Sequence, residues 1–194
     1  MELRSPTTLY VLLVLLGAQR LWEMRLSRAH IAAQGSGASK ADGTGNWVLM
    51  IAAHVIWIGG TGVELHLRGV VAPPPLFWGG GLLLLGAQAL RLWCLRSLGT
   101  MWNARGVVSP TLRVVDRGPY RWLRHPNYLA VVLELLALPL MAGAWVTLLV
   151  ASALNGVALR NRIRGEDALL RALPDYLERM GHKGGILPRL RSRA

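Results

Sequence analysis

The densest polar residues of the chain form two clusters with apolar sequence between them. Residues 118–128 read GPYRWLRHPNY, and Arg162, Glu166 and Asp167 follow after two apolar stretches. Charged side chains beside the hydrocarbon core of a bilayer are costly, and they commonly mark functional sites. We therefore expect the two clusters to come together in one site.

Each cluster has a local geometry that suits a polar ligand. Pro126 disfavours helix at His125 and is well placed in the first turn of a helix, so a helix should begin at Pro126. Its free amides and positive dipole would attract a carboxylate or an electron-rich heterocycle. Arg162 and Glu166 are four residues apart and share one helix face, and an ordinary surface ion pair is the alternative interpretation.

The composition indicates an all-α integral membrane protein. The 194 residues are 53% hydrophobic, the mean hydropathy is +0.36, and the apolar residues occur in long uncharged runs. Gly143 and Ala144 separate the last two runs, which are short and which we interpret as a helical hairpin. The five expected spans are Thr7–Trp22, Trp47–His66, Leu76–Leu98, Asn127–Ala142 and Trp145–Leu159.

The basic residues are distributed asymmetrically about these spans. Of the 22 Lys and Arg residues, three lie in 25–46, six in 96–124 and nine from Arg160 onward, against two on the opposite side. This asymmetry places the N-terminus outside and the C-terminus in the cytoplasm. The same asymmetry explains the net charge of +12 as a consequence of membrane topology, so we expect no nucleic-acid partner.

Polar residues within the spans have structural and functional interpretations. His54 and Glu64 lie nearly three turns apart, too far for one metal ion without other ligands, and the single Cys94 adds no thiolate cluster. We expect no metal, an interhelical hydrogen bond for His54, and an interfacial position for Glu64. Glu134 lies deep in the fourth span, where we expect it to face a cavity and serve catalysis; a structural ion pair is the alternative.

The polar clusters together resemble the isoprenylcysteine carboxyl methyltransferase (ICMT) family, whose signature is RHPxY, a helical hairpin, then Arg with an acidic pair four and five residues later. The likeness covers residues 98–188, about half the chain. Asp167 departs from the family's usual second Glu. Leu173 and Pro174 stand where Phe-Gly is common.

This resemblance implies S-adenosylmethionine as cofactor and divides a single domain, 1–194, into N-terminal spans, 1–97, and a cofactor-binding half, 98–194. The cofactor would lie on the cytoplasmic side, between the RHPNY turn and the last helix. No glycine-rich strand-to-helix loop offers a Rossmann alternative. The resemblance assigns the pocket to Arg124, His125, Pro126, Tyr128, Arg162 and Glu166, with Glu166 also orienting the acceptor.

The N-terminal half, including Glu23–Arg28, resembles a bacterial subgroup that methylates alkylpyrones and alkylresorcinols, the products of type III polyketide synthases. The implied acceptor is a ring with an acidic hydroxyl and an alkyl tail that enters from the bilayer of the bacterial cell membrane. In-line attack on a methyl group then depends on positioning and on excluding water. We expect Arg105 to bind the ring oxygen; a lipid-headgroup contact is the alternative.

Three other functions are compatible with the sequence. A prenylcysteine carboxyl methyltransferase would use the same cofactor on a different acceptor. A membrane reductase of related architecture would bind NADPH, and a lipid-binding scaffold would bind no nucleotide cofactor. Cofactor binding separates these classes, and an adjacent type III polyketide synthase gene would identify the acceptor class.

Overall fold

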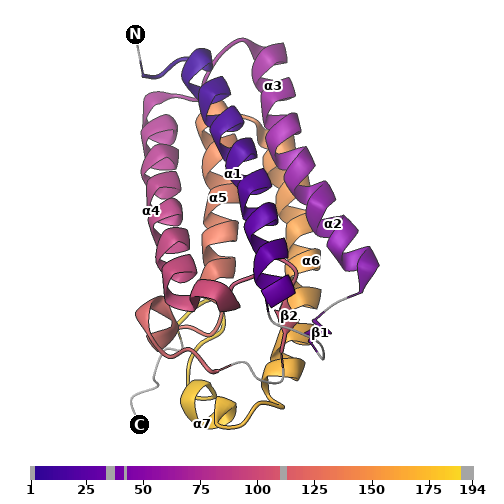
Figure 1. Ribbon diagram of the computed structural model, residues 1–194. Coiled ribbons are helices and arrows are strands. Elements are labelled where there is room, and N and C mark those ends of the chain that lie inside the picture. The colour runs from indigo at the N-terminus through magenta and orange to yellow at the C-terminus, as the bar shows by residue number, and fades with distance from the viewer. Residues whose placement is uncertain (1–2, 34–37, 42, 110–112, 189–194) are drawn as a thin grey trace.

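Long helices packed side by side make up the computed structural model, which describes residues 3–33, 38–41, 43–109 and 113–188 (Figure 1). The expected all-α class is confirmed. The only strands among these residues are β1 and β2, two residues each, which pair antiparallel. The elements are α1 Pro6–Ala33, β1 Ser39–Lys40, α2 Thr44–Val55, the π-helical turn Ile56–Gly60, α3 Thr61–Arg68, α4 Pro74–Leu98, the 3-10 turn Gly99–Met101, β2 Val107–Val108, the 3-10 turn Gly118–Arg121, α5 Pro126–Ala142, α6 Trp145–Leu170 and α7 Tyr176–Met180.

Two helical segments of the described chain have the length and hydropathy to cross a membrane. These are Thr44–Arg68, in which α2, the π-helical turn and α3 run on without a break, and Pro74–Met101. The helix Pro126–Ala142 is apolar but shorter. Five spans therefore remain a prediction.

Two helices continue beyond their expected ends. The first helix runs to Ala33 instead of Trp22, and α6 runs to Leu170 instead of Leu159. Arg, Glu, Leu and Ala are good helix formers, so a helix does not stop where its hydropathy falls. The extensions carry both helices from the apolar bundle into the polar end of the molecule.

Helices α5 and α6 form the expected hairpin. The backbone amide of Ala72, before α4, donates to the carbonyl of Met141 at 3.1 Å, so the turn at Gly143 lies at the same end as the loop before α4. A Cβ on Gly80 would lie 2.9 Å from the carbonyl oxygen of Ala137, so glycine there permits close packing of α4 on α5. The hairpin spans the bundle from one end to the other.

Glu64 on α3 caps the N-terminus of α6. Its carboxylate accepts the backbone amide of Thr147 at 2.5 Å, the Thr147 hydroxyl at 2.6 Å and the Val146 amide at 3.4 Å. A carboxylate satisfies the free amides and the positive dipole of a helix start. Glu64 therefore fixes α3 against the hairpin at the end remote from the polar clusters.

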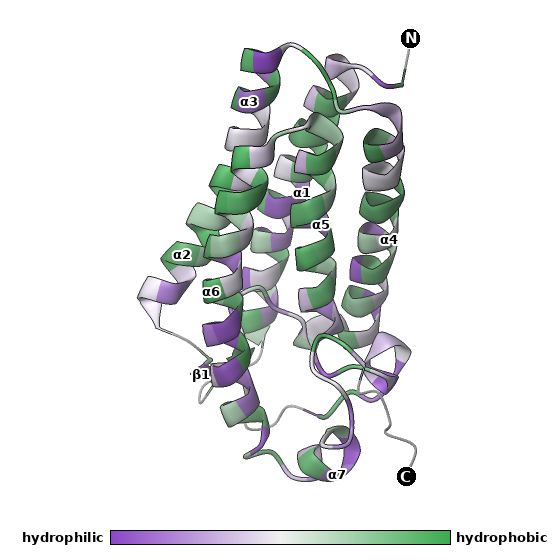
Figure 2. Cartoon of the chain, turned by 180° about the vertical axis from the view of Figure 1, so that it is seen from behind, coloured by the Kyte–Doolittle hydropathy of each residue, from purple (hydrophilic) through white to green (hydrophobic). Residues whose placement is uncertain are grey.

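The hydropathy pattern of the bundle suits a lipid environment. Figure 2 shows hydrophobic residues along most of the helical bundle and hydrophilic residues concentrated on lower α6, near β1 and on α7. Large apolar side chains are exposed along the helices, including Val14, Leu82, Leu85 and Leu149. Exposed apolar surface on this scale marks contact with lipid or protein rather than with water.

Candidate functional site

The RHPNY turn lies at the polar end of the bundle, where α5 begins. The helix starts at Pro126, as expected, and His125 precedes it with φ −128° and ψ 53°, outside the helical region. The amides of Arg124 and His125 donate to the carbonyls of Gly184 and Gly185 at 2.9 and 3.1 Å. The segment after α7 therefore completes the turn from outside the motif.

Asp167 on α6 joins the two polar clusters. Its carboxylate lies 2.8 Å from Nε2 of His125 and 3.0 Å from a terminal nitrogen of Arg124. Partial burial raises the pKa of the Asp167 carboxyl, but the hydrogen bond and charge of His125 and the charge of Arg124 outweigh it and hold the pKa below its ordinary value. Asp167 belongs to the second polar cluster, but no individual role was predicted for it; its place beside Glu166 was the available signal.

Tyr128 and Glu166 form a second link between the clusters. The Tyr128 hydroxyl donates a short hydrogen bond to the Glu166 carboxylate, and the ring of His125 stacks on that of Tyr128 with centroids 5.5 Å apart. The two clusters therefore come together, as expected, and their function as one site stays a prediction. Arg162 is only 1% exposed, and it donates to the carbonyl of Ala104 at 2.7 Å, so it is not a surface ion-pair residue.

A cavity that we call the polar pocket opens beside these residues. Arg124, His125, Tyr128 and Glu166 line it, together with Tyr120, Tyr176 and other residues of α4, α7 and the loop after α4. Burial raises the pKa of the Tyr176 hydroxyl to about 12, so this group stays a neutral donor and acceptor. The pocket combines aromatic rings, a guanidinium and a carboxylate.

Pro126 and Arg162 lie behind the wall of the polar pocket and do not line it. Pro126 starts α5, as above. A Cβ on Gly106, whose φ is +55°, would lie 2.3 Å from Nε of Arg162, so glycine lets this loop close over the guanidinium. Both residues shape the pocket from outside.

A larger cavity, which we call the apolar cavity, lies between α1 and α2 and has a volume of about 590 Å³. It shares four lining residues with the polar pocket, and these form what we call the junction. Two buried polar atoms of the junction, Nε1 of Trp102 and Oδ1 of Asn127, have no hydrogen-bond partner among the described residues. Orphaned polar atoms are expected where a ligand supplies the partner. The junction residues are Trp102, Asn103, Asn127 and Tyr128.

The segment 102–106 forms the partition between the two cavities, and the extension of α1 holds it. Ser27 accepts the amide of Ala104 at 2.9 Å, and Nδ1 of His30 donates to the carbonyl of Trp102 at 2.7 Å. Asn103 makes paired hydrogen bonds with the backbone of Val107 at 2.8 and 2.9 Å. This role of α1 was not predicted, because the first span was expected to end at Trp22.

Arg105 lines neither cavity. Its guanidinium lies 4.5 Å from the centre of the Trp47 ring, in a cation–π contact. Trp47 itself lines the apolar cavity, so Arg105 stands at the rim. The predicted contact between Arg105 and the acceptor oxygen stays a prediction.

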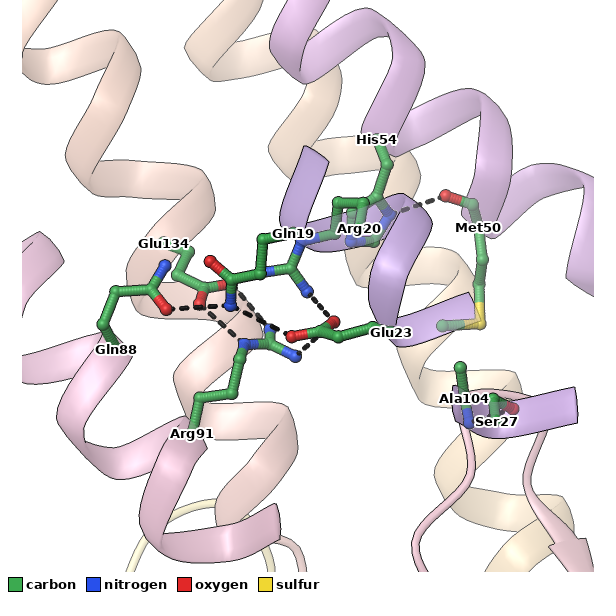
Figure 3. Close-up of polar contacts among 10 residues, drawn as sticks. All are labelled: Gln19, Arg20, Glu23, Ser27, Met50, His54, Gln88, Arg91, Ala104 and Glu134. Carbon is green, nitrogen blue, oxygen red and sulfur yellow. Dashed lines mark hydrogen bonds and ion pairs between the residues drawn. The ribbon is translucent and has the colours of Figure 1, made fainter. Parts of the chain in front are cut away.

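The structure corrects the expected position of Glu134, which lines neither cavity and has no exposed surface. Its carboxylate receives two hydrogen bonds from Arg91 at 2.6 and 2.7 Å and one from Arg20 at 2.9 Å (Figure 3). Glu23 completes the cluster, 2.6 Å from Arg20 and 3.3 Å from Arg91. The structural-pair alternative therefore describes Glu134, and the pairs join α1, α4 and α5.

His54 also differs from expectation. Its Nδ1 lies 2.8 Å from the carbonyl oxygen of Met50 on the same helix, so this hydrogen bond is within a helix and not between helices. The His54 side chain lines the apolar cavity.

Comparison with known proteins gives two matches. Residues 81–172 match the isoprenylcysteine carboxyl methyltransferase (ICMT) family. The chain is also 34% identical, over 168 residues, to the uncharacterized protein YpbQ of Bacillus subtilis, an alignment that covers 86% of this chain and 97% of the relative. The matched family segment contains α5, α6 and both polar clusters.

Proposed function

Because the chain belongs to the isoprenylcysteine carboxyl methyltransferase family, a family of membrane methyltransferases, we propose that it methylates an oxygen of a lipophilic acceptor with S-adenosylmethionine. The observation that carries this proposal is the meeting of a polar pocket and an apolar cavity at four shared residues. An enzyme that transfers a methyl group from a polar cofactor to a lipophilic acceptor needs two compartments of different polarity that touch at the point of transfer.

The polar pocket suits the proposed cofactor. When bound, S-adenosylmethionine supplies an electrophilic methyl group on a sulfonium centre. Aromatic faces and carboxylates attract such a cation, and Tyr120, Tyr128 and Glu166 line the pocket. Arg124 suits the carboxylate of the cofactor, and the free atoms of Asn127 and Trp102 suit polar contacts next to the methyl group.

The apolar cavity suits the tail of the acceptor. Leu21, Ile51 and Val55 line it and are also exposed on the helix surfaces, so a bound alkyl chain would be continuous with the surrounding hydrocarbon. The partition 102–106 and the junction would then hold the acceptor oxygen and exclude water during transfer. This arrangement supports entry of the acceptor from the bilayer.

We propose an alkylpyrone or alkylresorcinol as the acceptor, in the membrane of a bacterial cell, with a type III polyketide synthase as its source. The acidic ring hydroxyl of such a lipid needs no strong base, so Glu134, which lines neither cavity, is not required as one. Glu166, on the polar pocket, would orient the reacting groups. The cofactor side of the site would face the cytoplasm.

The test is cofactor binding and methyl transfer by detergent-purified protein. Wild type should bind S-adenosylmethionine, and His125→Ala and Glu166→Ala should each weaken binding by about 1 to 3 kcal/mol, the typical cost of a lost charged hydrogen bond. His66→Ala, an exposed histidine remote from both cavities, is the control. Isothermal titration calorimetry measures the affinities.

Two results would redirect the assignment. Tight binding of NADPH in place of S-adenosylmethionine would move the protein to the reductases. Methylation of a farnesylcysteine analogue, with no product from alkylpyrones and alkylresorcinols, would refute the polyketide-lipid acceptor and leave the methyltransferase intact.

A further inference from the structure

One wall of the apolar cavity is polar. Arg20, Glu23, Arg91 and His54 line it, deep among the helices (Figure 3). Polar and charged groups beside a purely hydrocarbon ligand would lose hydrogen bonds without compensation. A cavity that accepted only an alkyl or prenyl chain would not need this wall.

Helix packing accounts for only part of the polar wall. Arg91 and Glu134 have side chains 2% and 0% exposed, and their double hydrogen bond ties α4 to α5. The side chain of Arg20 is 14% exposed, so part of its guanidinium remains accessible. His54 forms a hydrogen bond to Met50 on its own helix and packs in a T-shaped arrangement with the Trp57 ring. Neither contact connects His54 to a neighbouring helix.

The hydrogen bond of His54 determines its tautomer. A carbonyl oxygen can only accept, so Nδ1 must carry the proton that it donates to Met50. In the neutral ring, Nε2 is then a hydrogen-bond acceptor. Because the ring lines the cavity, Nε2 is available to a hydroxyl group of a bound molecule.

The polar wall lies close to the junction along α5. Tyr128 of the junction and Glu134 of the cluster are six residues apart, a rise of about 9 Å. Val131, between them, lines the cavity. A single ring that carries oxygen atoms on two sides, with a hydrogen bond at each, is of this size, and it could place one oxygen at the junction and the other toward the wall.

We propose that His54, Arg20 and Glu23 recognise a second oxygen substituent of the acceptor, distinct from the oxygen that is methylated. This inference rests on the proposed function and specifies its substrate class. A hydroxyl would donate to His54 or Glu23, and a hydroxyl or carbonyl oxygen would accept from Arg20. The guanidiniums of Arg20 and Arg91 are balanced by the carboxylates of Glu23 on the wall and Glu134 behind it, so the wall suits an uncharged polar group and not a carboxylate.

The experiment compares an alkylresorcinol with the alkylphenol that has the same chain and lacks one hydroxyl. Wild type should favour the alkylresorcinol by about tenfold to a hundredfold in kcat/KM, since an unpaired polar wall penalises the analogue. His54→Leu should abolish most of this preference, and His54→Gln should restore part of it, because its side-chain oxygen accepts. His66→Leu, the same change at an exposed position of α3, is the control.

A binding measurement without cofactor accompanies the kinetics. Trp47 and Trp102 line the cavity, so quenching of tryptophan fluorescence reports occupancy by either lipid. Equal affinity of wild type for the two lipids, or an unchanged preference in His54→Leu, would overturn the second-oxygen subsite. A protein that prefers the alkylresorcinol through His54 but does not bind S-adenosylmethionine would retain the subsite and lose the proposed methyl transfer.

Discussion

Asp167 shows how one carboxylate can hold a site together. It connects α6 to both Arg124 and His125, so the two ends of the hairpin meet through it. Tyr128 and Glu166 make a further direct side-chain contact across the clusters. Charge-assisted hydrogen bonds of this kind are short and strong, and loss of one partner leaves the other unsatisfied.

The pKa of Asp167 predicts an acid limit for the site. Because the folded-state pKa is depressed, the stabilisation is complete above the ordinary aspartate pKa of 3.8 and is lost as the pH falls through the lower folded value. S-adenosylmethionine affinity and thermal stability should therefore decline together on acidification. Calorimetry and thermal unfolding in detergent across this pH range measure both.

Asp167→Asn should weaken the cofactor affinity at neutral pH by about 1 to 3 kcal/mol and remove this contribution to the acid limit. The matched control is Asp175→Asn at an exposed position whose φ of 61° suits asparagine as well as aspartate. If Asp167→Asn bound cofactor as tightly as the control, the proposed linkage would be wrong.

At the scale of elements, the charged cluster of Arg20, Glu23, Arg91 and Glu134 connects three helices of the bundle. Glu134 on α5 accepts hydrogen bonds from α1 and α4, and Glu23 on α1 accepts one from Arg91 on α4. Breaking a buried ion pair from one side leaves an uncompensated charge, whereas the intact cluster is balanced. The complete cluster therefore has little net effect on the free energy of unfolding, whereas the loss of one member lowers it strongly.

Glu134→Gln should accordingly destabilise the protein by about 3 to 5 kcal/mol, as measured by chemical or thermal unfolding in detergent. The exposed Glu178 offers the control, and Glu178→Gln should leave stability unchanged. A fully stable Glu134→Gln protein with impaired turnover would instead favour a direct catalytic role for this carboxylate.

A second contact between elements lies where the chain directly after β1 packs on α6. A Cβ on Gly165 would lie 1.5 Å from the carbonyl oxygen of Ala41, and the amide of Ala41 bonds Gly106 at 2.9 Å. The paired strands thus rest directly on the helix that carries Arg162 and Glu166. Only glycine permits this approach of two backbones.

Gly165→Ala should therefore destabilise the protein by about 1 to 3 kcal/mol and lower cofactor affinity, because the strand pair must move away from α6. Gly156 on the same helix has open space around its Cβ position, and Gly156→Ala should be neutral or slightly stabilising. Thermal unfolding and cofactor titration of the two variants test this directly. Similar behaviour of the two variants would show that the strand pair is not packed as described.

At the scale of the whole molecule, the two ends of the bundle have different characters. One end carries Arg4, which donates to the carbonyl of Ala72 at 3.3 Å, and the turn at Gly143. The other end carries the polar pocket, α7 and the hydrophilic part of α6 (Figure 2). The hydrophilic end of the bundle is the end at which the sequence concentrates its Lys and Arg residues.

The orientation in the membrane is testable with reporter fusions. A reporter at the C-terminus should be cytoplasmic, and reporters inserted at Pro73–Pro75 or after Gly143 should be external, because the structure puts these two turns at one end. The pair of turns is an internal check, since both must report the same side. A C-terminal reporter found outside would reverse the orientation and place the cofactor pocket away from the cytoplasm.

The sequence by itself determined the helical class, the start of α5 at Pro126, the hairpin turn and the common helix face of Arg162 and Glu166. These features depend on local signals. Apolar runs, proline and the four-residue spacing of Arg162 and Glu166 act within one or two turns of helix. Such signals can be interpreted without knowledge of the fold.

Only the tertiary structure decided what Glu134, His54 and the extension of α1 do. Glu134 pairs with Arg20, which is 114 residues away, and Ser27 binds a backbone amide 77 residues away. A buried carboxylate has the same local sequence whether it faces a cavity or a guanidinium, because its partner comes from another helix. This environment exists only once the helices have packed, and it decides whether the carboxylate is a catalytic group or part of a structural ion pair.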